Sequence, residues 1–155
     1  MGKLILFVCT GNTCRSPMAE YYFNSEMRKL KKETEITEII AISRGLYVES
    51  SSMMSGNAKK ALASNNIICN TDDILHMSKQ IDGEIMREAD FVYGITEAHT
   101  KILKEDFPQY KEKVFDMPVN IGDPYGGNLE IYEKCLKKIK SAVDVIIKSL
   151  DTARG

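Results

Sequence analysis

The sequence is short of several residue types that would point to particular classes of protein. Its 155 residues include no tryptophan, two histidines and four cysteines, and the formal net charge is −1. No stretch approaches the ~20 apolar residues of a membrane-spanning helix, and the near-neutral charge gives no bias towards nucleic acid or a membrane surface. Four cysteines without the pattern of a disulfide scaffold indicate reduced thiols. We therefore expect a cytoplasmic protein of one domain, residues 1–155, with neither nucleic acid nor membrane as a partner.

The same scarcity argues against metal and targeting sites. The pair Cys9 and Cys14 has no second ligand pair, and His76 and His99 offer no ligand spacing, so no metal is predicted. His99 is expected on an exposed or partly exposed helix face and has no assigned role. The apolar run at 4–9 is too short for the core of a signal peptide, and no small-residue cleavage site follows it.

Strand and helix patterns alternate along the chain. The first apolar segment, 3–8, is typical of a strand buried on both faces of a parallel sheet. Ser16 and Pro17 then predict a helix start, with serine as the N-cap and proline at the first helical position. Later strands are predicted at 36–43, 89–95 and 114–117, and later helices at 57–66, at 97–107 and from 129 onward. This alternation predicts an α/β layer fold around a parallel sheet.

The segment after the first strand has the composition of an oxyanion site with a nucleophile. Cys9 and Arg15 are six positions apart, with Gly11 and Asn12 between them. Glycine and asparagine tolerate a left-handed backbone, so successive N–H groups can converge on an anion at the start of the helix. Arg15 supplies a bidentate fork, and the positive field favours the reactive thiolate of Cys9. The candidate phosphate-binding residues are Thr10, Gly11, Asn12, Thr13, Cys14 and Ser16, of which Ser16 can also donate to the sulfur.

Other interpretations of this loop are less well supported. An isolated cysteine and arginine would be a buried strand residue and a surface charge, but here a glycine and an asparagine lie between them. A nucleotide-binding P-loop is excluded because no Gly-Lys-Ser or Gly-Lys-Thr follows. The loop therefore predicts a phosphate site with a sulfur nucleophile.

A candidate general acid stands near the other end of the chain. A phosphoryl group leaves an oxygen or nitrogen more easily when that atom is protonated. Asp123 lies in the segment Asp123-Pro124-Tyr125-Gly126-Gly127, where proline stiffens the loop and the glycines let it fold over a ligand. An Asp-Pro pair alone is more often a turn former, but together with the Cys9 loop it favours a catalyst. Asp123 also argues against a phosphopeptide-binding module and a phosphocysteine carrier of a sugar transport system, because neither needs an acid.

These residues resemble the low-molecular-weight protein tyrosine phosphatase family over essentially the whole chain. The motifs are Cys9-Thr10-Gly11-Asn12-Thr13-Cys14-Arg15-Ser16, His76-Met77-Ser78-Lys79-Gln80 and Asp123-Pro124. The resemblance implies a three-layer α/β sandwich, with a central four-stranded parallel sheet and helices on both faces, and no cofactor. It implies a phosphocysteine on Cys9, phosphoryl binding by Arg15, and Asp123 as the acid that later activates water. It also implies that Ser43 and His76 support the loop through Asn12.

Two positions bear on the substrate pocket. Thr13 stands where tyrosine-specific members of the family usually carry an apolar branched residue. Tyr125 precedes two glycines where those members often add a second aromatic residue. Both features resemble the bacterial protein arginine phosphatase branch, so we favour phosphoarginine in a protein or peptide, with phosphotyrosine as the alternative substrate. Arg44 departs from the family, which usually has a small residue at its position.

The remaining cysteines have several interpretations. Cys14 could form a reversible disulfide with Cys9, which the family shows, or could be a buried small residue. Cys69 and Cys135 are expected to be structural, and this counts against an arsenate reductase, which needs a cysteine relay.

Overall fold

The central layer is a parallel sheet of four strands. The computed structural model describes residues 2–33, 38–67 and 76–154. Strands β1 (Lys3–Cys9), β2 (Ile39–Gly45), β3 (Phe91–Gly94) and β4 (Val114–Asp116) lie in the order β2-β1-β3-β4, and every pairing is parallel. The central strand β1 is buried from Ile5 to Cys9, which explains why its sequence is an unbroken apolar run.

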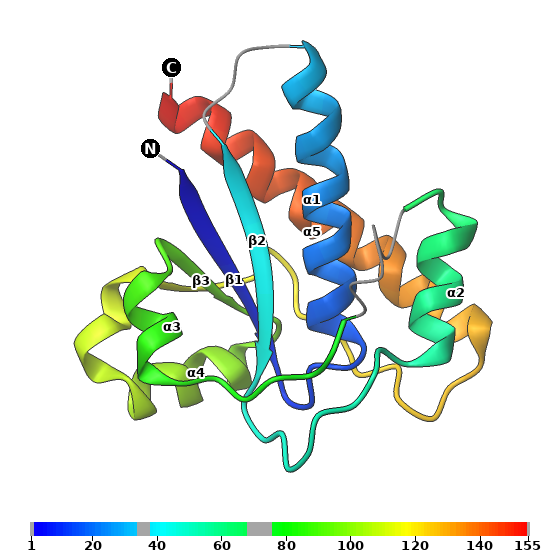
Figure 1. Ribbon diagram of the computed structural model, residues 1–155, viewed down its shortest axis with the longest axis horizontal. Helices are drawn as coiled ribbons and strands as arrows, with labels where there is room; N and C mark the ends of the chain where they lie inside the picture. The colour runs from blue at the N-terminus through cyan, green and yellow to red at the C-terminus, as the bar shows by residue number, and fades with distance from the viewer. Residues whose placement is uncertain (1, 34–37, 68–75, 155) are drawn as a thin grey trace.

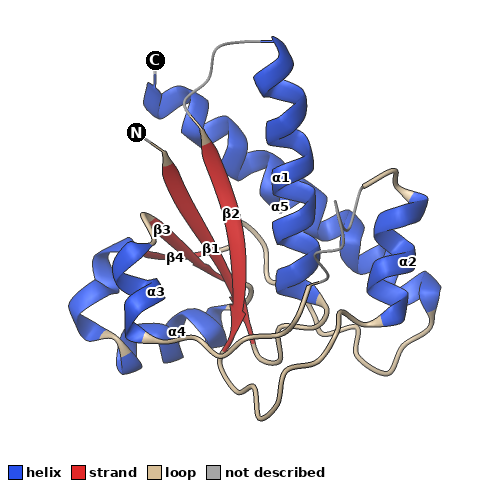
Figure 2. Cartoon of the chain, viewed as in Figure 1, coloured by secondary structure: helices blue, strands red, loops and turns tan. Residues whose placement is uncertain are grey.

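Helices cover both faces of this sheet (Figures 1 and 2). Helices α1 (Arg15–Glu33), α2 (Gly56–Ser64) and α5 (Leu129–Arg154) lie on one face, and α3 (Gly83–Glu88) and α4 (Glu97–Asp106) lie on the other. Side chains of β1 alternate between the two cores: Phe7 and Cys9 belong to the first, and Leu6 and Val8 to the second. The predicted three-layer α/β sandwich is therefore confirmed.

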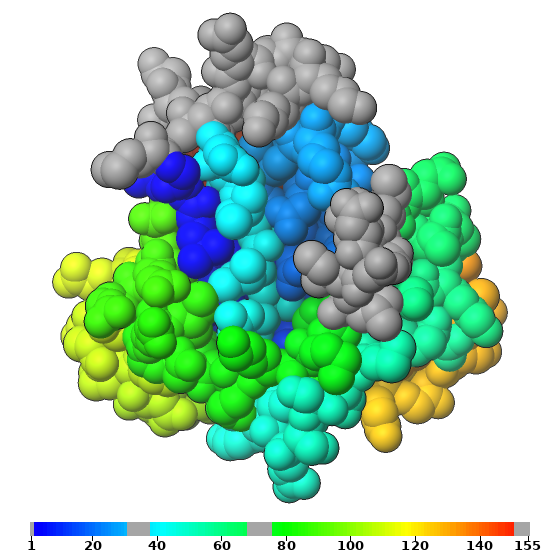
Figure 3. Space-filling view, in the orientation of Figure 1, coloured from blue at the N-terminus to red at the C-terminus, as the bar shows by residue number. Residues whose placement is uncertain are grey.

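Strand β2 forms an edge of the sheet, where the Asn24 side chain hydrogen-bonds the backbone N–H and carbonyl of Ala41. In Figure 3 the strand is visible at the surface, in cyan, between the helices of the two faces. Ile40 at its outer side is 47% exposed. Among the described residues, no helix combines the length and the apolar character needed to cross a membrane.

Two helical segments and several boundaries differ from the prediction. The six-residue α3, whose N-cap Asp82 accepts a hydrogen bond from the Ile85 N–H, and the 3-10 helix η1 (Pro108–Lys113) are too short to produce a helical period. The placement of Ser16 as N-cap was wrong. Helix α1 begins at Arg15, and the Met18 N–H already donates to the Cys14 carbonyl at 3.1 Å. The first part of the predicted strand at 36–43 lies outside the described residues.

Candidate active site

The loop between β1 and α1 encloses a cavity at the carboxyl end of the central strand. Residues 9–15, together with Asp123 and Tyr125, line a space of about 220 Å³. Asn12 has the left-handed backbone expected in this loop, with φ of 59°. Gly11, for which the same conformation was expected, does not have it: among the described glycines only Gly126 has a positive φ. The loop thus brings together all the candidate phosphate-binding residues apart from Ser16, which is the second residue of α1.

Two donors surround the sulfur of Cys9, which is 3% exposed. The Asn12 N–H points at Sγ from 3.3 Å, and Ser16 Oγ lies 3.0 Å from Sγ. The Asn12 side-chain amide donates to Ser16 Oγ at 2.8 Å, so the serine hydrogen is left for the sulfur. Both donors can hydrogen-bond the sulfur when it carries negative charge, where such bonds are stronger than neutral ones.

Asn12 is the centre of the hydrogen bonds that hold the loop. Its Nδ2 donates to Ser43 Oγ at 2.9 Å, and its Oδ1 accepts the Lys79 N–H at 3.0 Å. His76 Nε2 lies 2.8 Å from the Asn12 carbonyl, to which it must donate. Burial lowers the pKa of His76, which favours the neutral ring. Ser43 and His76 therefore both contact Asn12.

The ends of β2 and β1 also pack closely. A Cβ on Gly45, the last residue of β2, would lie 2.6 Å from Val48 and 2.8 Å from the Thr10 carbonyl. Only glycine therefore fits at this position beside the loop.

Glu20 extends this network and was not identified from the sequence. It accepts a hydrogen bond from Ser43 Oγ at 2.6 Å, and burial raises its pKa to about 7. The network therefore runs from Glu20 through Ser43 and Asn12 to Ser16 and the Cys9 sulfur. No sequence pattern marks Glu20, because a carboxylate in a helix is usually solvated.

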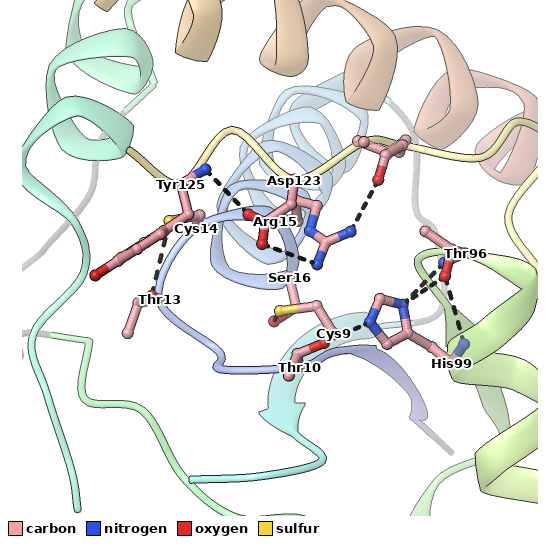
Figure 4. A network of polar contacts seen from close by, with 12 residues as sticks. Cys9, Thr10, Thr13, Cys14, Arg15, Ser16, Thr96, His99, Asp123 and Tyr125 are labelled. Atoms are coloured by element: carbon pink, nitrogen blue, oxygen red, sulfur yellow. Dashed lines mark hydrogen bonds and ion pairs between the residues drawn. The ribbon is translucent and has the colours of Figure 1, made fainter. Parts of the chain in front are cut away.

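Arg15 and Asp123 lie next to each other at the cavity (Figure 4). The Arg15 side chain is 8% exposed, and its Nη2 lies 3.7 Å from Asp123 Oδ2. Its Nη1 donates to the Ile121 carbonyl at 3.0 Å. Asp123 Oδ1 accepts the Tyr125 N–H at 3.0 Å, so this aspartate also forms the turn expected of an Asp-Pro pair. Residues more than a hundred positions apart thus converge on one site.

Thr13, Cys14 and Tyr125 form the outer part of the cavity. Tyr125 is 80% exposed and lines the cavity. Cys14 is buried, and its Sγ lies 3.3 Å from the Tyr132 hydroxyl and 3.7 Å from Thr13 Oγ1. Cys9 and Cys14 are both free thiols.

Of the other two cysteines, the structure describes Cys135. Cys135 is buried on α5, and burial raises its pKa to about 12, consistent with a structural role. Cys69 lies outside the described residues. Within the described part of the chain, no three histidine, cysteine, aspartate or glutamate side chains are grouped to hold a metal ion.

The expectation that His99 lies on an exposed or partly exposed helix face was wrong. The residue is 5% exposed, and its Nε2 lies 2.9 Å from Thr10 Oγ1, in the nucleophile loop. It occupies the first turn of α4, where Thr96 caps the helix. The Thr-x-x-His spacing at a predicted helix start could have placed His99 in a helix cap, but it does not indicate the contact with Thr10.

Comparisons with known proteins agree with this geometry. The model of the low molecular weight phosphotyrosine protein phosphatase family matches residues 4–154. A protein-arginine-phosphatase of Bacillus subtilis (strain 168) is 32% identical over 157 residues, covering 97% of this chain and 98% of the relative. The YwlE arginine phosphatase of Geobacillus stearothermophilus superposes with a TM-score of 0.84 at 30% identity, covering 98% of this chain and 95% of that one.

A third likeness concerns the nucleophile directly. A YwlE arginine phosphatase in which the cysteine is replaced by a phosphorylated active-site serine superposes with a TM-score of 0.83 at 30% identity, over 96% of this chain and 95% of that one. Both the family match and the identity extend over nearly the whole sequence. This chain therefore belongs to the low molecular weight phosphotyrosine protein phosphatase family.

Proposed function

We propose that this protein is a cysteine-dependent phosphatase that hydrolyses phosphorylated protein side chains, with phosphoarginine preferred over phosphotyrosine. One observation carries the proposal: the Cys9 sulfur, the Arg15 guanidinium and the Asp123 carboxyl group line one cavity. These groups are a nucleophile, an oxyanion binder and an acid, which are the three roles that phosphoryl transfer through a cysteine requires.

In the first step the Cys9 thiolate attacks phosphorus. The S–P bond forms and the bond from phosphorus to the leaving nitrogen or oxygen breaks, while Asp123 gives its proton to that atom. Arg15 and the N–H groups of the loop bind the phosphoryl oxygens as charge develops on them. Arg15, held by the Ile121 carbonyl, lies 3.7 Å from Asp123, so the oxyanion binder and the acid are next to each other at the cavity.

In the second step water attacks the phosphocysteine. The Asp123 carboxylate takes a proton from the water, the S–P bond breaks, and inorganic phosphate leaves. Ser16 Oγ, 3.0 Å from Sγ, stabilises the departing thiolate. The phosphorylated active-site serine of the YwlE variant supports a covalent intermediate at the Cys9 position.

The preference for phosphoarginine is supported by Thr13 and by the activity of two relatives. Protein-arginine-phosphatase is the activity of the B. subtilis relative, and arginine phosphatase that of the G. stearothermophilus structure. A threonine hydroxyl at the rim can accept a hydrogen bond from a guanidinium, whereas an apolar branched side chain at this position cannot. Phosphotyrosine is the second candidate, because the family model describes phosphotyrosine phosphatases.

The substrates in this proposal are phosphorylated proteins or peptides, and inorganic phosphate and other oxyanions are competing ligands. The test is kcat/KM on two peptides of matched sequence, one with phosphoarginine and one with phosphotyrosine. We expect faster turnover of the phosphoarginine peptide, and no turnover of either by Cys9→Ser. A higher kcat/KM for the phosphotyrosine peptide would overturn the proposed preference for phosphoarginine. Binding of both peptides without phosphate release by the wild-type protein would indicate a binding module instead.

A further inference from the structure

His99 is buried against the nucleophile loop although it belongs to α4, which lies on the opposite face of the sheet from α1. Helix α4 can approach the loop because β3 ends in Gly94: a Cβ there would lie 2.4 Å from Thr100 Oγ1 and 2.6 Å from the Thr100 nitrogen. Since β3 pairs directly with β1, the first turn of α4 lies beside the carboxyl end of β1. Figure 4 shows the His99 ring between Thr96 and Thr10.

The hydrogen bonds of the ring determine its tautomer. The Thr96 backbone N–H donates to His99 Nδ1 at 3.1 Å, and Thr96 Oγ1 lies 3.0 Å from the same atom. A backbone N–H can only donate, so Nδ1 must be the unprotonated nitrogen. The hydrogen of the neutral ring is therefore on Nε2, which donates to Thr10 Oγ1 over 2.9 Å.

The surroundings keep the ring neutral. Burial lowers the pKa of His99 to about 4; the Arg15 guanidinium contributes to this shift, and Asp123 opposes it. The N-terminal end of α4, where His99 is the third residue, also disfavours a positive charge. A protonated ring would have no acceptor on Nδ1, so the hydrogen bond from the Thr96 backbone N–H would be lost.

This arrangement sets the direction of the Thr10 hydroxyl. Its oxygen accepts from His99, and within the described part of the chain it has no other hydrogen-bond partner. Thr10 lines the cavity directly after the nucleophile and is exposed there. The hydroxyl hydrogen is therefore free to point at an anion in the cavity.

We propose that His99 is a positioning residue that acts through Thr10: its Nε2–H holds the threonine oxygen, so that the threonine O–H becomes an additional donor to the bound phosphoryl group. This inference rests on the proposed function, because it assigns a further donor to the same site. A loop that relied on its backbone N–H groups and Arg15 alone would gain nothing from this pair.

The test is a double-mutant cycle of Thr10→Val and His99→Asn. Valine removes the hydroxyl at similar volume, and the asparagine oxygen can still accept the Thr96 N–H in place of Nδ1 but cannot reach Thr10. With p-nitrophenyl phosphate we expect each single change to lower kcat/KM about tenfold, the size of one charge-assisted hydrogen bond. His99→Asn should then cost little more in the Thr10→Val background.

Two conservative variants serve as controls. His99→Gln can place an amide donor near the Nε2 position, and Thr10→Ser retains the hydroxyl, so both should recover most of the activity. Urea unfolding of each variant reports any loss of stability separately. Additive effects of the two changes, or full activity of Thr10→Val, would overturn the proposal and leave His99 with a purely structural role.

The wild-type protein, the two single variants and the double variant of the cycle can also be titrated with inorganic phosphate. This measurement separates the inference from the proposed function. Absence of turnover by the wild-type protein would refute the phosphatase assignment, yet non-additive losses of phosphate affinity would still support the His99–Thr10 pair. If the wild-type protein and Thr10→Val bind phosphate equally and turn over substrate equally, the role of the His99–Thr10 pair is refuted. The phosphatase assignment then still stands.

Discussion

The two loops that meet at the active site are held in opposite ways. Most of the nucleophile loop is buried or half-buried, and Asn12 by itself makes hydrogen bonds to Ser16, Ser43, Lys79 and His76. The acid loop is open: the Asp123 side chain is 55% exposed, and Tyr125 is 80% exposed. Binding a phosphoryl group requires donors that are already in place, whereas the acid must reach leaving groups of different shapes. A rigid cradle and an adjustable acid follow from this difference.

The largest effect should come from the rigid side. Cys9→Ser should lower kcat by at least ~10⁴-fold, because the hydroxyl is a much weaker nucleophile than the thiolate. Affinity for inorganic phosphate should survive, since the N–H groups and Arg15 remain. Steady-state kinetics and a phosphate titration measure the two quantities. Substantial residual turnover would contradict the covalent mechanism.

The acid loop should show a loss that depends on the substrate. Asp123→Asn should slow peptides with poor leaving groups by about 100-fold or more, the range for a general acid, and should slow p-nitrophenyl phosphate much less. The asparagine oxygen can still accept the Tyr125 N–H, so unfolding in urea should be nearly unchanged. An equal loss on both substrates would point to another acid.

The contrast in rigidity can be measured as stability. Asn12→Ala removes three side-chain hydrogen bonds, to Ser16, Ser43 and Lys79, and leaves alanine in a left-handed backbone. We expect the free energy of unfolding to fall by about 3 kcal/mol. Asn12→Gly removes the same bonds without the backbone strain, so its free energy of unfolding should fall less. A change as small as that of Asp123→Asn would show that the two loops do not differ in this way.

The substrate preference should change by a smaller factor. Thr13→Ile replaces the rim hydroxyl with an apolar branched side chain, and it should shift the ratio of kcat/KM from phosphoarginine towards phosphotyrosine by about tenfold, the size of one pocket contact. Thr13→Ser, which keeps the hydroxyl, is the matched control. An unchanged ratio would show that other residues set the pocket width.

The last effect concerns pH. Burial raises the pKa of Glu20 from 4.5 to about 7, so the folded protein holds this proton more tightly than the unfolded chain does. The free energy of unfolding should therefore fall as pH rises from about 4.5 to about 7 and then level off. Glu20→Gln should have a flatter profile over this window in urea unfolding. Identical profiles would mean that Glu20 has the same pKa in the folded protein and in the unfolded chain.

The sequence could predict the strands, the nucleophile loop and the acid loop because each depends on neighbouring residues. The apolar run of β1 and the Gly11-Asn12 pair are local signals, and Ser43 and His76 came from the family resemblance. Glu20 and His99 could not be found in this way. Their roles depend on the order of strands β2-β1-β3, which brings Ser43 and the start of α4 to either side of β1. Strand order is a tertiary property that no window of sequence contains.

The turn at Asp123 has a consequence for where its proton can reside. The Tyr125 N–H already donates to Oδ1, and an oxygen that accepts such a bond is the less favourable one to protonate. The acidic hydrogen therefore belongs on Oδ2, the oxygen that faces Arg15. The backbone of the acid loop in this way makes the two chemically equivalent oxygens of one carboxyl group inequivalent, and delivers the proton from a single direction.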